Sequence, residues 1–92
     1  MTYLKRHRAD TLQREIFTAL RQIGIFIVDT SQAGHGCPDG FAYCPARGWT
    51  ALEIKTGTAG LQPSQEAAGQ RAPICVVRSV AEGLALFGVV DR

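Results

Sequence analysis

Two carboxylates and one amine stand at spacings that could bring them together as a charged patch able to bind a metal ion. Asp39 follows a proline, and Glu53 and Lys55 come later in the chain with one residue between them. In a strand, Glu53 and Lys55 would project from the same face, because side chains alternate. If Ala46 is the centre of a hairpin, Asp39 lies opposite Glu53. The resulting patch of carboxylate oxygens would suit Mg²⁺ or Mn²⁺.

A less specific interpretation of the same residues is also open. Like charges placed opposite each other across a sheet are destabilising, so Asp39 and Glu53 need a compensating cation. Lys55 supplies one, and a divalent metal would supply more. The alternative is that Glu53 and Lys55 form an ordinary ion pair on the solvent side of a strand.

A helix is predicted before this patch in the sequence. The apolar spacing predicts a helix that starts at Asp10 or Thr11 and ends before Gly24. Glu15 stands at the edge of the predicted apolar stripe. The stripe itself repeats at the helical period, through Leu12, Ile16, Ala19, Leu20 and Ile23.

The remaining elements follow from apolar runs and turn residues. The run Ile25–Val28 predicts a buried strand. Further strands are expected over residues 39–44, 49–55 and 73–78, the first two joined by the turn 45–48. Helices are expected from Pro63 to Gln70 and after Ser79. The order α-β-β-β-α-β with a short C-terminal helix predicts an α/β fold. Its mixed four-stranded sheet has an antiparallel meander, a right-handed parallel crossover and flanking helices.

Length and charge limit the possible classes of protein. A chain of 92 residues with net charge +2 suits one domain, placed at residues 9–92. The basic excess lies in residues 1–8, as Lys5, Arg6 and Arg8. This segment is predicted to be an arm that contacts phosphate, or else a solvated basic tail. No apolar run is long enough for a membrane span and no signal peptide is evident, so a cytoplasmic location is expected.

Three cysteines, an odd number, are expected to be reduced thiols. The gaps between Cys37, Cys44 and Cys75 are too wide for an ordinary structural zinc site. Cys44 and Cys75 stand in apolar runs and are predicted to be small core residues.

Taken in order, these residues resemble the VRR-NUC branch of the PD-(D/E)xK nuclease superfamily, in the small stand-alone form of phages and prophages. The resemblance covers about residues 8–88. It rests on Glu15 in the first helix and on segments 34–39, 52–57 and 61–65. It implies a restriction-endonuclease-like core. The pattern departs at Cys37 and Gln62, and neither departure removes a catalytic atom.

The resemblance also implies roles for individual residues. Asp39 and Glu53 would hold the metal together with the backbone carbonyl of Ile54, and Glu15 would join the coordination, often through water. Lys55 would orient the attacking water or stabilise charge in the transition state. No small-molecule cofactor is implied.

Three further residues have two interpretations each. Gln65 matches a glutamine that lines the family's site, or it is a solvated residue in the first turn of a helix. His35 could contact DNA or be an ordinary loop residue between glycines. Trp49 could contact DNA or cover a sheet edge.

The expected function is therefore a metal-dependent, structure-selective DNA endonuclease that resolves four-way (Holliday) junctions as a homodimer. Paired cuts on a two-fold symmetric junction favour a dimer. Phe17, which lies off the apolar stripe, and residues 87–90 are candidate interface. The alternatives are a nuclease for flaps, nicks or ordinary duplex, and a non-catalytic module that binds DNA or a protein.

Overall fold

The computed structural model describes residues 3–34, 36–57, 60 and 73–89, and only the backbone of residues 3–8. The helix expected over residues 63–70, with Gln65, lies outside the described residues, as does His35. No helix in the described ranges is long and apolar enough to cross a membrane. The described elements are α1 Tyr3–Gln22, β1 Phe26–Asp29, β2 Gly40–Cys44, β3 Gly48–Ile54, β4 Ile74–Val77 and α3 Val80–Leu86.

The strands form one mixed four-stranded sheet in the order β1-β2-β3-β4. β1, β2 and β3 pair antiparallel, and β4 pairs parallel to β3. Within the hairpin, Tyr43 faces Trp49 and Gly40 faces Leu52, so the register is centred on Ala46. The predicted meander, parallel pairing and hairpin register are all confirmed.

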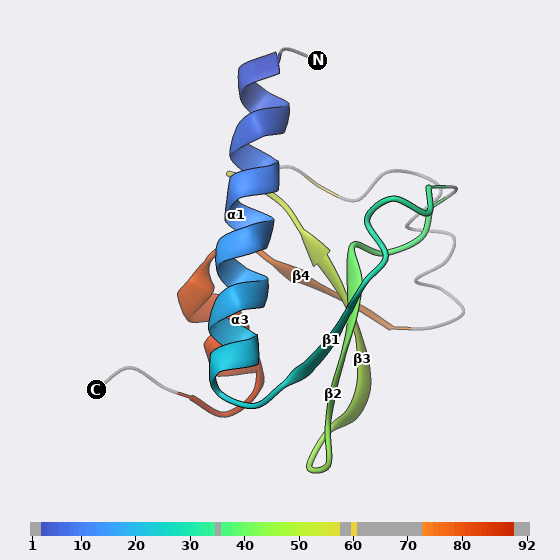
Figure 1. Ribbon diagram of the computed structural model, residues 1–92, viewed down its shortest axis with the longest axis vertical. Coiled ribbons are helices and arrows are strands. Elements are labelled where there is room, and N and C mark those ends of the chain that lie inside the picture. Colours follow the sequence, from blue (N-terminus) through green and yellow to red (C-terminus); the bar gives the residue numbers. More distant parts are fainter. Residues whose placement is uncertain (1–2, 35, 58–59, 61–72, 90–92) are drawn as a thin grey trace.

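Alternation of side chains gives the sheet two different faces. We call one the helix face, because α1 and α3 both lie against it (Figure 1). Its buried side chains join residues of α1 in a single core, and these sheet residues are Ile27, Ala42, Leu52, Ile54 and Val77. We call the other the second face, and its residues are Phe26, Val28, Phe41, Tyr43, Trp49, Ala51 and Glu53.

Phe17 is part of the core, and the prediction that it lies on the surface is wrong. Its side chain is 2% exposed. The ring fits because residue 40 has no side chain. A Cβ built on Gly40 would lie 2.7 Å from Cζ of Phe17. Because Gly40 has no side chain, a wider strip of the α1 surface, including Phe17, can be buried against the sheet.

Helix α1 begins at Tyr3, so the expected start at Asp10 or Thr11 is wrong. Residues 3–8 continue the helical backbone rather than forming a separate arm, since they are mostly good helix formers with no Gly or Pro among them. At the other end of the fold, Ser79 accepts a hydrogen bond from the Glu82 N–H, which confirms the predicted cap of α3.

Strand β1 is not the buried strand that its composition predicts. Ile27 is buried, but Phe26 and Val28 are exposed. The physical reason is position: β1 is an edge strand, and the two described helices, α1 and α3, lie against the face that carries Ile27. Cys44 and Cys75 pack against the core as predicted, and all three cysteines are free thiols.

We predict that Phe17→Ala lowers the free energy of unfolding by about 3 kcal/mol, because it leaves a cavity above Gly40. Phe26→Ala removes an exposed ring and should cost less than about 1 kcal/mol. Urea denaturation of the two variants measures the difference. Equal losses would contradict the assignment of Phe17 to the core and Phe26 to the surface.

Candidate active site

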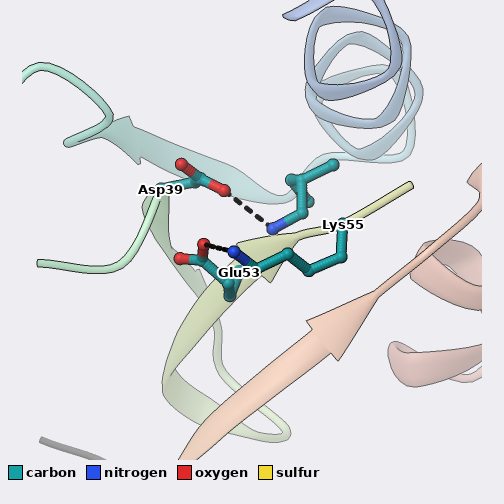
Figure 2. A network of polar contacts seen from close by, with 4 residues as sticks. Asp39, Glu53 and Lys55 are labelled. Carbon is teal, nitrogen blue, oxygen red and sulfur yellow. Dashed lines mark hydrogen bonds and ion pairs between the residues drawn. The ribbon is translucent and has the colours of Figure 1, made fainter. Parts of the chain in front are cut away.

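The three charged residues that open the sequence argument meet at one end of the hairpin. Asp39 directly precedes β2, Glu53 is the penultimate residue of β3, and Lys55 directly follows β3. Figure 2 shows the Lys55 amine beside the Glu53 carboxylate, and the Asp39 carboxylate turned toward the backbone where the two strands separate. The confirmed register brings them together, because it places Asp39 across from Glu53.

The carboxylate of Asp39 caps the end of the β2–β3 ladder. Its Oδ2 accepts a hydrogen bond of 2.8 Å from the Ile54 N–H (Figure 2). If the ladder continued, Ile54 would face Pro38. The Pro38 carbonyl instead accepts a bond of 2.7 Å from Thr30 Oγ1. The Asp39 carbonyl accepts another from the Thr30 N–H at 2.8 Å, so the residue is fixed through both its backbone and its side chain.

Glu53 and Lys55 form a buried ion pair. Lys55 Nζ lies 3.2 Å from Glu53 Oε2, and the two side chains are 14% and 5% exposed. They therefore do not form the solvent-side pair considered as the alternative. Removing two charges from water is costly, and a buried ion pair is seldom more stable than apolar side chains of the same volume. Stability alone does not explain this pair.

The pKa of Asp39 is raised to about 6, chiefly by burial and also by the nearby negative charge of Glu53. The hydrogen bond from Ile54 and the positive charge of Lys55 oppose this rise. Two carboxylates thus share a partly buried site with one ammonium group. Perturbed carboxyl groups of this kind gather at functional sites.

The donor set fits a hard divalent cation. Mg²⁺ is commonly bound by one or two carboxylates, with waters and substrate phosphates filling the other positions. Asp39 and Glu53 meet that requirement, and the negative charge of Glu53 is close enough to act on the Asp39 carboxyl group. The Ile54 backbone belongs to the site through its N–H.

Of the other sequence-predicted site residues, Glu15 is exposed on α1. Within the described ranges, no group of three or more Asp, Glu, His or Cys side chains is placed to hold a metal. Gln65 and His35 lie outside the described residues. For the proposed DNA contacts Lys5, Arg6 and Arg8, the structure gives only a position in the first turns of α1.

Asp29 is a neighbour that sequence reasoning missed. It ends β1 opposite Gly40, and its charge contributes to the raised pKa of Asp39. Desolvation acts to raise the pKa of Asp29 itself, but hydrogen bonds from the backbone and hydroxyl of Ser31 lower it on balance. The only sign in the sequence that Asp29 belongs near the site is that its carboxylate directly follows an apolar run. Its position beside Asp39 depends on the β1–β2 register, which the loop of residues 30–39 leaves open.

The chain was compared with protein families, curated proteins and solved structures. None of them matches. A functional interpretation must therefore come from the site itself, in which Asp39, Glu53 and Lys55 form a compact, partly buried cluster at the end of two paired strands.

We predict that Asp39→Asn stabilises the metal-free protein at pH 7.5 but not at pH 4. An acid whose pKa is raised on folding binds its proton more tightly in the folded state, so wild-type stability falls as the pH rises from about 4 to about 6. Asparagine can still accept the Ile54 hydrogen bond. The gain at pH 7.5 should be about 1 kcal/mol, less than for a fully buried group.

Urea unfolding in EDTA at the two pH values measures this effect. An NMR titration of the Asp39 carboxyl carbon gives the pKa directly. Asp10→Asn, which removes an exposed carboxylate of α1, is the matched control and should change the free energy of unfolding by less than about 0.5 kcal/mol. A titration midpoint near 4 for Asp39 would contradict the burial and charge argument.

Proposed function

We propose that the protein is a metal-dependent, structure-selective DNA endonuclease of the PD-(D/E)xK type. The observation that supports this proposal best is the cluster of Asp39, Glu53 and Lys55, in which two carboxylates and an amine meet at the end of β2 and β3. The order of the described elements and the mixed sheet are compatible with the restriction-endonuclease-like core that the resemblance implies.

In this proposal, Asp39 and Glu53 hold Mg²⁺ or Mn²⁺. When bound, the metal would polarise the scissile phosphate and lower the pKa of a coordinated water. The Ile54 N–H fixes the orientation of the Asp39 carboxylate before metal or DNA arrives, and such preorganisation reduces the cost of binding. The resemblance adds the Ile54 carbonyl as a ligand, Glu15 through water, and Gln65 in the lining of the site.

Lys55 is assigned to the reacting phosphate rather than to the metal. Its ammonium group is held beside Glu53 at 3.2 Å, and both side chains are largely withdrawn from solvent. A cation fixed in this way can orient the attacking water or stabilise the negative charge that develops on the phosphate oxygens. Because water is largely excluded, this stabilisation is stronger than it would be on an open surface.

The substrate class comes from the resemblance. It points to four-way DNA junctions, cut by a homodimer whose two-fold axis matches the junction. Lys5, Arg6, Arg8 and His35 remain proposed DNA contacts. Of the proposed interface residues, Val89 is 41% exposed, whereas Phe87 packs against the core. The buried Phe17 is not available for an interface.

We predict that Asp39→Asn and Glu53→Gln each reduce DNA cleavage at least about 100-fold, because each removes a metal-binding charge. The assay uses end-labelled four-way, flap and linear DNA with Mg²⁺ or Mn²⁺. Binding of Mn²⁺, followed by its electron paramagnetic resonance signal, should weaken in both variants. Asp10→Asn, an equivalent change at an exposed site, serves as the control. Unchanged cleavage by Glu53→Gln would overturn the nuclease proposal.

A second variant separates the role of Lys55 from that of the carboxylates. Lys55→Met keeps the length of the side chain and removes its charge. We expect cleavage to fall about 100-fold, while Mn²⁺ binds as tightly as before or more tightly because a competing cation is gone. Loss of Mn²⁺ binding without loss of fold, checked by circular dichroism, would contradict the assignment of Lys55 to the phosphate.

A further inference from the structure

A row of three aromatic rings crosses the second face of the sheet. Phe26 on β1 is the register partner of Tyr43 on β2, which in turn is the partner of Trp49 on β3. The Trp49 ring centroid lies 6.1 Å from that of Phe26 and 5.2 Å from that of Tyr43. We call Phe26, Tyr43 and Trp49 the aromatic row.

The aromatic row is open to solvent. Phe26 is 61% exposed, Trp49 59% and Tyr43 39%. A single exposed apolar residue is ordinary, but a contiguous group of large apolar side chains on one surface marks a binding site. None of the three rings belongs to the buried core, which lies on the helix face.

The aromatic row and the candidate active site share one face of one strand. Trp49 and Glu53 are both on the second face of β3, separated by four residues, which corresponds to about 13 Å along a strand. Only the pair Phe41 and Ala51 lies between them in the β2–β3 register. A single extended chain lying along this face could therefore contact both places.

The strand segments that carry the aromatic row contain no carboxylate that would repel an anionic occupant. Arg47, in the hairpin turn, is exposed, and its guanidinium lies 3.9 Å from Cys75 Sγ on the helix-face side of the sheet. It lines a pocket of about 240 Å³ together with Trp49, Thr50, Pro73 and Cys75. Residues 23–28 and 40–52 contain no aspartate or glutamate. A second copy of the chain placed on the row would present the same arginine and no carboxylate from these stretches.

We propose that the aromatic row is a stacking platform for unpaired DNA bases. Exposed aromatic rings bind single strands without strong sequence preference, because every base has a π face. Base pairs in an intact duplex already cover these faces by stacking on one another. The platform therefore selects DNA that has unpaired bases.

This inference narrows the substrate class of the proposed nuclease, and in that respect it rests on the proposed function. The separation of about 13 Å corresponds to roughly four nucleotides at the stacked spacing of a DNA strand. The favoured substrate has unpaired bases within a few nucleotides of the bond that is cut. Flaps, and junctions with an opened branch point, meet this condition, whereas a blunt duplex does not.

Trp49 is the only tryptophan of the chain, so its fluorescence reports directly on the aromatic row. The full-length protein in EDTA is titrated with a short oligothymidylate and, separately, with a blunt duplex. Stacking should quench Trp49 fluorescence to saturation with the single strand, at an affinity at least tenfold higher than for the duplex. Equal affinities, or binding without quenching, would overturn the proposal.

Two variants localise the effect while Trp49 remains as reporter. Phe26→Ala should weaken single-strand binding about tenfold. Ile23→Ala, which shortens another exposed apolar side chain, should leave the binding unchanged. Sedimentation equilibrium tests whether a second copy of the chain, rather than DNA, occupies the aromatic row. If Phe26→Ala converts a dimer to a monomer and leaves DNA quenching intact, the row is an interface between copies and the proposal is wrong.

Cleavage assays in Mg²⁺ distinguish failure of this inference from failure of the proposed function. Cleavage by the wild type without quenching of Trp49 would overturn the platform and leave the nuclease intact. Saturable quenching by single strands without any cleavage would support the platform and overturn the nuclease.

Discussion

The hydrogen bond from the Ile54 N–H to the Asp39 carboxylate determines the geometry at the end of the hairpin. At this point the β2 backbone leaves its partner strand, because the Pro38 carbonyl bonds Thr30 instead. The Asp39 carboxylate replaces a backbone carbonyl as the acceptor for the Ile54 N–H. This N–H is therefore hydrogen-bonded, and the same bond holds the carboxylate beside Glu53. The raised pKa of Asp39 follows from this arrangement, because burial and the negative charge of Glu53 both act on its carboxyl group.

The two faces of the sheet differ in composition and in burial. The helix face is filled by apolar side chains that pack with α1, and these contacts hold the fold together. The second face changes along the strands, from aromatic rings near the hairpin turn to charged groups where the strands separate. This face exposes apolar rings and buries an ion pair, which is the reverse of what stability favours. Such a reversal is expected where a surface is kept for binding and chemistry.

The hairpin was predictable from sequence because a short turn fixes the register and alternation then fixes the faces. The placement of Asp39 across from Glu53 followed from that reasoning alone. The start of α1 was not predictable in the same way, because the capping residues Asp10 and Thr11 compete with helix formers before them. The exposure of Phe26 was also missed, since an apolar run does not distinguish an edge strand from a buried one.

Gly40 separates the core from the site by a single residue. On one side the Phe17 ring occupies the space that a side chain at position 40 would need, and on the other side stands Asp39. A side chain there would bring its Cβ to 2.7 Å from Cζ of Phe17 and 3.0 Å from the Val28 carbonyl oxygen, so the ring or the strand would have to move. The depth to which Phe17 is buried and the backbone next to Asp39 therefore depend on the same position. A core substitution at residue 40 would act on the neighbour of the candidate site.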